Sequence, residues 1–221
     1  MVLFLITAAT EMEMAPIRKR LAACRDVEFL VTGVGMLEAA LTLARKLCGV
    51  GAEVDGVVNL GVAGAFVDTG VEILDLCLAK REIIGDFGIS AGEQIIPFSD
   101  EAISSPRDFS LQNPLQARSK IVLAEKEIAY HTGVFVTVNT VSGSKSRGVF
   151  LREQHLAICE NMEGAAIART CVAHGLDCLE LRSVSNMVED RDPARWRLAE
   201  AIDVCADAAL QLIPSLLDAR P

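Results

Sequence analysis

The stretch Glu160-Asn161-Met162-Glu163-Gly164-Ala165-Ala166 lies where an apolar strand pattern ends and a helical pattern begins. The helical pattern continues over residues 165–173 and stops at Gly175, a residue type common at the end of a helix. Open α/β sheets bind ligands at the carboxyl ends of their strands, so Glu163 is a candidate functional acid. The alternative is that Glu163 only complements the helix dipole, which is worth about 0.3 to 1 kcal/mol at a surface.

Short apolar runs rich in β-branched residues recur along the chain and predict strands. They span residues 2–7, 28–32, 55–60, 73–84, 133–141 and 178–184. Helical patterns lie between several of these runs, for example over residues 36–49. This alternation favours an α/β fold, in which a largely parallel sheet carries helices on both faces.

The last helix has the clearest boundaries. Asp192 can cap it and Pro193 suits its first turn. The face predicted to cover the sheet consists of Trp196, Ala199, Ile202, Ala206, Leu210 and Ile213. Residues 85–116, with their three prolines at 97, 106 and 114, are instead predicted to form a long excursion from the core. Such excursions often close over ligands or meet a second subunit.

Length, composition and charge limit the class of protein. A chain of 221 residues suits one domain over residues 1–221 with a sizeable core. The hydrophobic share is 51%, yet no run approaches the roughly 20 apolar residues of a membrane-spanning helix. The first apolar run lacks a preceding basic residue and is followed by two acids, unlike a signal peptide. A net charge of -9 argues against a nucleic-acid partner.

The sequence predicts a cytoplasmic protein without a metal site or a nucleotide cofactor. The seven cysteines contain no CxxC pair, as expected of buried thiols in a reducing cytoplasm. The three histidines lack metal-ligand spacing, so no metal is expected. A nucleotide cofactor is not expected either, because the turn Gly33-Val34-Gly35 continues with Glu38 where a dinucleotide fingerprint has its third glycine.

Further candidate residues follow other predicted strands. Glu13 comes after the first strand, where a solvated loop acid is the simpler interpretation. The run Gly61-Val62-Ala63-Gly64 is predicted to turn after its strand and bring backbone close to a ligand. Arg182 lies within the last strand run and needs a buried partner, for which Glu13 is a plausible choice, because an unpaired buried cation is costly.

Taken together and in this order, these segments resemble the superfamily of nucleoside phosphorylases and methylthioadenosine nucleosidases. The most specific one is residues 161–166, similar to the family segment in which Met162 packs on a ribose and Glu163 binds its hydroxyls. The resemblance covers almost the whole chain. It implies a three-layer α/β/α domain with a central, partly mixed twisted sheet, no cofactor, and a homodimer or larger homo-oligomer.

Two departures from the family pattern narrow the implied reaction. Asn59 and Val62 stand where phosphorylases hold phosphate. Neither side chain has the positively charged pair of N–H donors with which an arginine binds phosphate, so water is the expected acceptor of the ribosyl group. Asn186 stands where adenosine-type nucleosidases carry an acid. Its amide can donate to N7 or to a 6-oxo group, which favours hypoxanthine over adenine as the leaving group.

The segment from Arg182 to Val188, with Arg191, Asp192 and Trp196, is also similar to futalosine hydrolases. The resemblance therefore implies a nucleosidase that releases hypoxanthine from futalosine in menaquinone biosynthesis. Glu13 is expected to act as general base, Glu163 to hold the ribose, Asn186 to polarise the base and Arg182 to orient Glu13, while Ala63 and Gly64 join Val62 and Met162 in lining the pocket. The alternatives are a methylthioadenosine/S-adenosylhomocysteine nucleosidase, a purine nucleoside phosphorylase, or a nucleoside-binding protein without turnover.

Overall fold

The structure is a computed structural model that describes residues 3–50, 54–92, 94–96, 98 and 105–218. Val2 and Pro97, which belong to two of the predicted segments, lie outside the described residues. In the described part of the chain, eight strands form one sheet in the order β10-β4-β8-β9-β3-β1-β2, with β7 added beside β4. They are β1 (Phe4–Ala8), β2 (Val27–Val31), β3 (Gly56–Phe66), β4 (Leu76–Ile84), β7 (Asp108–Ser110), β8 (His131–Thr137), β9 (Ala157–Asn161) and β10 (Asp177–Val188).

The sheet is mixed and closes on itself. Strand β10 runs parallel to β3 along one edge and antiparallel to β4 along the other. Strand β9 pairs with β8 in parallel and with β3 in antiparallel fashion. Because β4 and β8 are also paired, the strands β3, β10, β4, β8 and β9 form a closed ring. Side chains that point into this ring are shielded from water.

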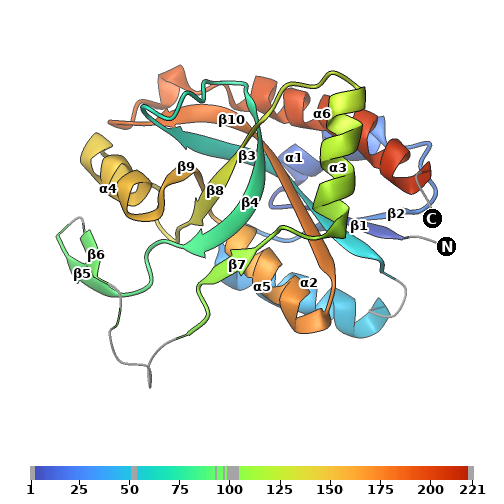
Figure 1. Ribbon diagram of the computed structural model, residues 1–221, viewed down its shortest axis with the longest axis horizontal. Helices are drawn as coiled ribbons and strands as arrows, with labels where there is room; N and C mark the ends of the chain where they lie inside the picture. The colour runs from blue at the N-terminus through green and yellow to red at the C-terminus, as the bar shows by residue number, and fades with distance from the viewer. Residues whose placement is uncertain (1–2, 51–53, 93, 97, 99–104, 219–221) are drawn as a thin grey trace.

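Helices cover both faces of the sheet, as predicted (Figure 1). One face carries α1 (Glu11–Arg20), α3 (Pro114–Glu125) and α6 (Leu198–Asp218), which share a core that includes Met14, Leu123 and Leu212. The opposite face carries α2 (Met36–Val50) and α5 (Gly164–His174), whose side chains Leu43 and Ile167 belong to a second core. Helix α4 (Lys145–His155) packs on β8 and β9. The three-layer α/β/α prediction is confirmed.

Two local predictions were wrong. The run 61–64 does not turn: β3 continues to Phe66, because β10 pairs with it along that whole length. The last helix begins at Leu198, after a 3₁₀ turn at Pro193–Arg195 that Asp192 caps. Trp196 therefore precedes the helix, and Ala199 and Leu210 are exposed instead of facing the sheet.

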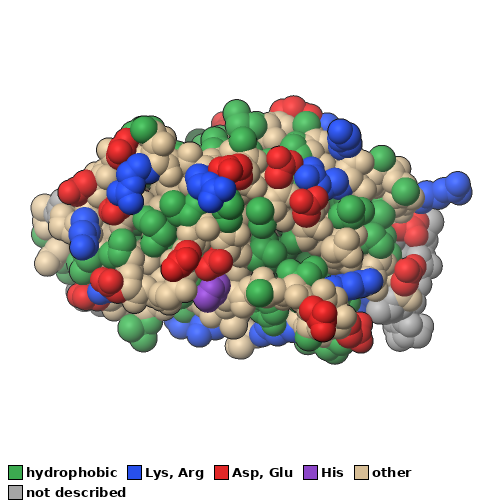
Figure 2. Space-filling view, turned by 90° about the horizontal axis from the view of Figure 1, so that it is seen from above, with side chains coloured by type: hydrophobic (Ala, Val, Ile, Leu, Met, Phe, Trp, Pro, Cys, Tyr) green, Lys and Arg blue, Asp and Glu red, His purple; other side chains and the backbone are tan. Residues whose placement is uncertain are grey.

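The predicted excursion contains short elements of its own. Its described residues include a small hairpin of β5 (Ile89–Ala91) and β6 (Gln94–Ile96), followed by β7. The helix α3 begins at Pro114, inside the range assigned to the excursion. On the face shown in Figure 2, acidic and basic side chains are interspersed among hydrophobic ones. No helix in the described ranges is long and apolar enough to cross a membrane.

Candidate active site

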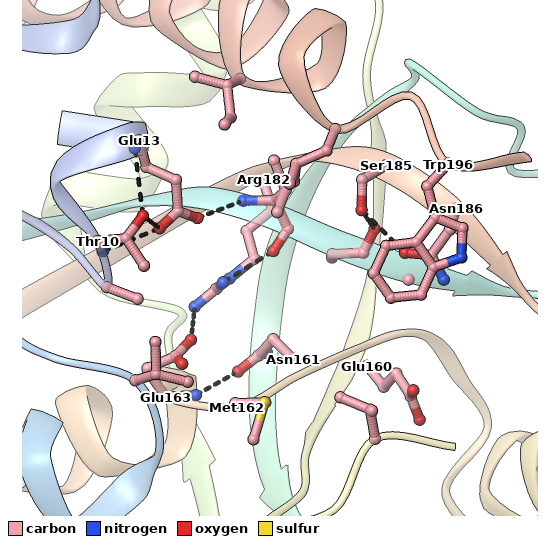
Figure 3. Close-up of a pocket in the computed structure, with 18 of the residues that line it drawn as sticks. Thr10, Glu13, Glu160, Asn161, Met162, Glu163, Arg182, Ser185, Asn186 and Trp196 are labelled. Atoms are coloured by element: carbon pink, nitrogen blue, oxygen red, sulfur yellow. Dashed lines mark hydrogen bonds and ion pairs between the residues drawn. The ribbon is translucent and has the colours of Figure 1, made fainter. Parts of the chain in front are cut away.

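A cavity of about 340 Å³ lies at the carboxyl-terminal parts of the parallel strands β1, β3 and β10, beside the end of β9. Figure 3 shows its lining. All eight residues singled out from the sequence line this cavity: Glu13, Val62, Ala63, Gly64, Met162, Glu163, Arg182 and Asn186. Asn59, considered at the sequence level as a phosphate-site position, does not: it is buried and donates to Glu180 at 3.1 Å.

Helix α1 begins with a capping box that holds Glu13 at the cavity. The Thr10 hydroxyl accepts from the Glu13 N–H, and the Glu13 carboxylate accepts from the Thr10 N–H at 3.0 Å and from the Thr10 hydroxyl at 2.8 Å. Its other oxygen accepts from the Val62 N–H at 3.2 Å. A side chain at Gly61 would clash with this arrangement, because a Cβ there would lie 2.7 Å from the Glu13 oxygen that accepts from Val62. Glu13 is 6% exposed and fixed in place, not a solvated loop acid.

Glu163 stands at the N-cap position of α5 but does not cap the helix with its side chain. Instead one carboxylate oxygen accepts from the Gly35 N–H at 3.1 Å, and the other pairs with the Arg182 guanidinium at 3.4 Å. The Asn161 amide oxygen accepts from the N–H groups of Glu163 and Gly164 at 3.0 and 2.7 Å. Because Asn161 caps the helix, the Glu163 carboxylate is free to face the cavity.

Arg182 pairs with different acids from the one expected. Its guanidinium donates to Glu180 at 2.7 Å and to Glu163 at 3.4 Å, and to the Val62 carbonyl at 2.9 Å. Its link to Glu13 passes through the backbone of Val62, whose N–H Glu13 accepts. Burial would lower the pKa of Arg182, but Glu180 and Glu163 outweigh burial and raise it. Arg182 is therefore a permanent buried cation among several acids.

Asn186 follows an irregularity in β10, where the pairing with β3 skips Ser185. The Ser185 hydroxyl donates to the Asn186 amide oxygen at 2.9 Å, and the amide nitrogen donates to the Met187 carbonyl at 3.3 Å. The amide has a second N–H, which remains for a ligand. Figure 3 shows Trp196 over this end of the cavity, and the Arg191 guanidinium lies 4.7 Å from the centre of the Trp196 ring.

Polar side chains from every strand of the ring meet beneath the cavity. Glu82 accepts from the Asn161 amide at 2.5 Å and from the Thr137 hydroxyl at 2.7 Å. Glu180 lies close by, since a Cβ on Gly164 would contact Glu82 and come within 2.6 Å of Glu180. Burial and the neighbouring Glu180 raise the pKa of Glu82 well above its usual range. Burial and the charge of Glu180 thus both disfavour the ionised form of Glu82.

Several residues of the site were not predicted from the sequence. Thr10 was detectable, because Thr10 and Glu13 have the spacing of a capping box. Glu160, also in the lining, accepts from the Ser142 N–H at 2.9 Å and from its hydroxyl at 2.6 Å. Nothing local in the sequence points to Glu160 or Ser185. No cluster of three or more His, Cys, Asp or Glu side chains among the described residues is arranged to hold a metal ion.

Known proteins resemble the chain over most of its length. The model of the phosphorylase superfamily matches residues 17–218. A futalosine hydrolase of Streptomyces coelicolor is 32% identical over 198 residues, which cover 88% of this chain and 81% of that protein. An aminodeoxyfutalosine nucleosidase of Helicobacter pylori strain J99 is 28% identical over 194 residues, covering 88% and 81%. A solved structure of a futalosine hydrolase mutant of Helicobacter pylori strain 26695 has a TM-score of 0.84 at 24% identity and covers 99% of both chains, which shows the fold.

Proposed function

The chain belongs to the phosphorylase superfamily, and from this membership we propose that it is a purine nucleoside N-glycosidase that hydrolyses futalosine to hypoxanthine and dehypoxanthine futalosine. The observation that carries the proposal is the convergence of two buried acids and an amide, Glu13, Glu163 and Asn186, on one cavity. The relative at 32% identity, a futalosine hydrolase, supports the same substrate.

In the proposed mechanism, the bond between ribosyl C1′ and purine N9 breaks and its electron pair leaves with the base. A water oxygen bonds to C1′, and Glu13 accepts a proton from that water. Glu13 suits this role because three hydrogen bonds fix its carboxylate. The hypoxanthine anion is stabilised by the free N–H of Asn186 and is then protonated from solvent.

Glu163 is assigned to the sugar. Its carboxylate faces the cavity beside Met162, and its negative charge stabilises a ribosyl group that becomes positive as the base departs. Arg182 orients the Glu163 carboxylate directly. It orients the Glu13 carboxylate only through the backbone of Val62. Trp196 provides an aromatic wall at the Asn186 end, where the base would stack.

The proposal is tested by incubating purified protein with futalosine, inosine and methylthioadenosine, first without and then with phosphate. We expect hypoxanthine from futalosine together with the free sugar, at a rate that phosphate does not change. Adenine release from methylthioadenosine at a higher rate would favour a methylthioadenosine/S-adenosylhomocysteine nucleosidase. A sugar 1-phosphate would indicate a phosphorylase, and tight binding without base release a nucleoside-binding protein.

Compartment and assembly belong to the same proposal. All seven cysteines are free thiols, which suits a reducing cytoplasm. The neighbouring helices α2 and α5 carry exposed apolar side chains, Leu37 at 78%, Leu41 at 52% and Val172 at 60% exposure. A second copy of the chain would cover them in a homodimer or larger assembly. Sedimentation of wild-type protein and of a Leu37→Glu variant tests this, and a wild-type monomer would rule it out.

A further inference from the structure

Glu160 is a buried acid of the cavity that the proposed mechanism does not use. It lies in β9 and is 4% exposed, yet it belongs to the cavity lining. The Ser142 N–H and hydroxyl each donate to a different oxygen of its carboxylate, at 2.9 and 2.6 Å. One residue thus supplies two donors that fix the orientation of the group. A carboxylate can accept about four hydrogen bonds, so acceptor capacity remains for a ligand.

Glu160 shares one corner of the cavity with Asn186. Gly64 lies between them: a Cβ on Gly64 would lie 3.1 Å from the Asn186 amide nitrogen and 3.6 Å from Cγ of Glu160. Figure 3 shows both on the Trp196 side of the cavity, away from Glu13. The corner therefore presents an N–H donor beside a fixed acceptor, at the end assigned to the base.

This pairing distinguishes two classes of purine. A 6-oxopurine presents the acceptor O6 next to the donor N1–H, which matches the Asn186 N–H and the Glu160 carboxylate. A 6-aminopurine presents a donor next to the unprotonated N1, whose lone pair would face the carboxylate. Sites built to hydrogen-bond a particular N–H reject analogues that lack it, because the site's own polar group stays unpaired.

We propose that Glu160 is a specificity-determining residue that accepts a hydrogen bond from N1–H of a 6-oxopurine base, with Asn186 donating to the adjacent edge. This inference rests on the proposed function, since it assumes that a purine occupies the cavity. Ser142 is the positioning residue that holds the carboxylate toward the base.

The first test compares Glu160→Gln with wild-type protein on futalosine and on the same nucleoside carrying adenine instead of hypoxanthine. A hydrogen bond to a charged acceptor is worth roughly a 10- to 150-fold effect, so kcat/KM for futalosine should fall by that factor. The adenine-bearing substrate should lose little or gain, because the glutamine amide can donate to N1. Equal losses on both substrates would mean that Glu160 only anchors Ser142, and would overturn the proposal.

A second test needs no variant and so remains informative if Glu160→Gln does not fold. Binding of hypoxanthine, 1-methylhypoxanthine and adenine to wild-type protein is measured by calorimetry. We expect hypoxanthine to bind roughly 10- to 150-fold more tightly than either of the others. Equal binding of all three bases overturns the inference about Glu160. Hypoxanthine binding with this preference but no release of hypoxanthine from futalosine would instead contradict the proposed function alone.

Discussion

Arg182 donates to Glu163 across 3.4 Å, and both side chains are almost completely buried. The same guanidinium holds Glu180 at 2.7 Å, so one cation serves two acids and stands near a third, Glu13. Removing one partner of such a buried cluster leaves charge uncompensated, which is far more costly than the loss of a surface ion pair.

We predict that Arg182→Gln destabilises the protein by about 3 to 5 kcal/mol. The neutral amide leaves Glu163 and Glu180 facing each other without a cation between them. Urea unfolding at neutral pH measures the change. Arg20→Gln is the matched control, because Arg20 forms its ion pairs with exposed acids on α6 and should cost less than about 1 kcal/mol. Similar losses in both variants would contradict the central role given to Arg182.

Glu13→Gln should slow futalosine hydrolysis by about 100- to 10,000-fold, because the amide cannot accept the proton of the attacking water. The fold should persist, since the amide oxygen can still accept from Thr10. Glu11→Gln provides a control on the same helix, as Glu11 is exposed and pairs only with Arg18 among the described residues. Single-turnover rates of the two variants check the prediction, which full activity in Glu13→Gln would refute.

Asn186→Asp should shift the preference of the enzyme from hypoxanthine toward adenine as the leaving group. An aspartate accepts from a 6-amino group, and in its protonated form it donates to N7, whereas its ionised form repels O6. We expect kcat/KM on futalosine to fall by roughly 10- to 150-fold and the ratio to the adenine-bearing substrate to decrease. An unchanged ratio would show that Asn186 does not contact the base.

Glu82→Gln should stabilise the protein relative to wild type, and this gain in stability should be larger at neutral pH than at acidic pH. The pKa of Glu82 is raised in the folded state, so the wild type loses stability as pH rises above the unfolded-state value toward the folded-state value. Glutamine does not titrate and removes this loss. The difference in melting temperature between variant and wild type should therefore grow from pH 4.5 upward. A difference that is constant across this range would mean that folding does not raise the pKa of Glu82.

Much of the fold was predictable because its signals are local. The β-branched runs and the apolar stripe over 36–49 correspond to strands and to α2, and the family resemblance is confirmed by the match to the phosphorylase superfamily. Helix α1 was missed because the sequence Glu11-Met12-Glu13-Met14-Ala15-Pro16 has no clear apolar stripe and contains a proline. The capping box at Thr10 was the signal that would have found it.

The part of the site that was not predicted depends on long-range closure of the sheet. In the sequence, Glu82 and Glu180 are single acidic residues within two separate apolar runs. Only the closed ring of strands brings the two side chains together near Arg182. The choice of Glu13 as the partner of Arg182 was wrong for a local reason instead: the strand β10 itself supplies Glu180, two residues away on the same face of the strand. Glu160 and Ser142 are likewise 18 residues apart and meet only in the folded protein.

The proposed mechanism requires that Glu13, Glu163 and Asn186 surround one bond between a sugar and a purine. It is tested most directly by the crystal structure of the protein with a stable analogue in which a cationic pyrrolidine replaces the ribose and 9-deazahypoxanthine replaces the base. We predict that the pyrrolidine hydroxyls contact Glu163, that the base lies between Asn186 and Glu160, and that a water molecule bridges Glu13 and the ring carbon. A ligand bound with its base against Glu13, or outside this cavity, would contradict the proposed mechanism.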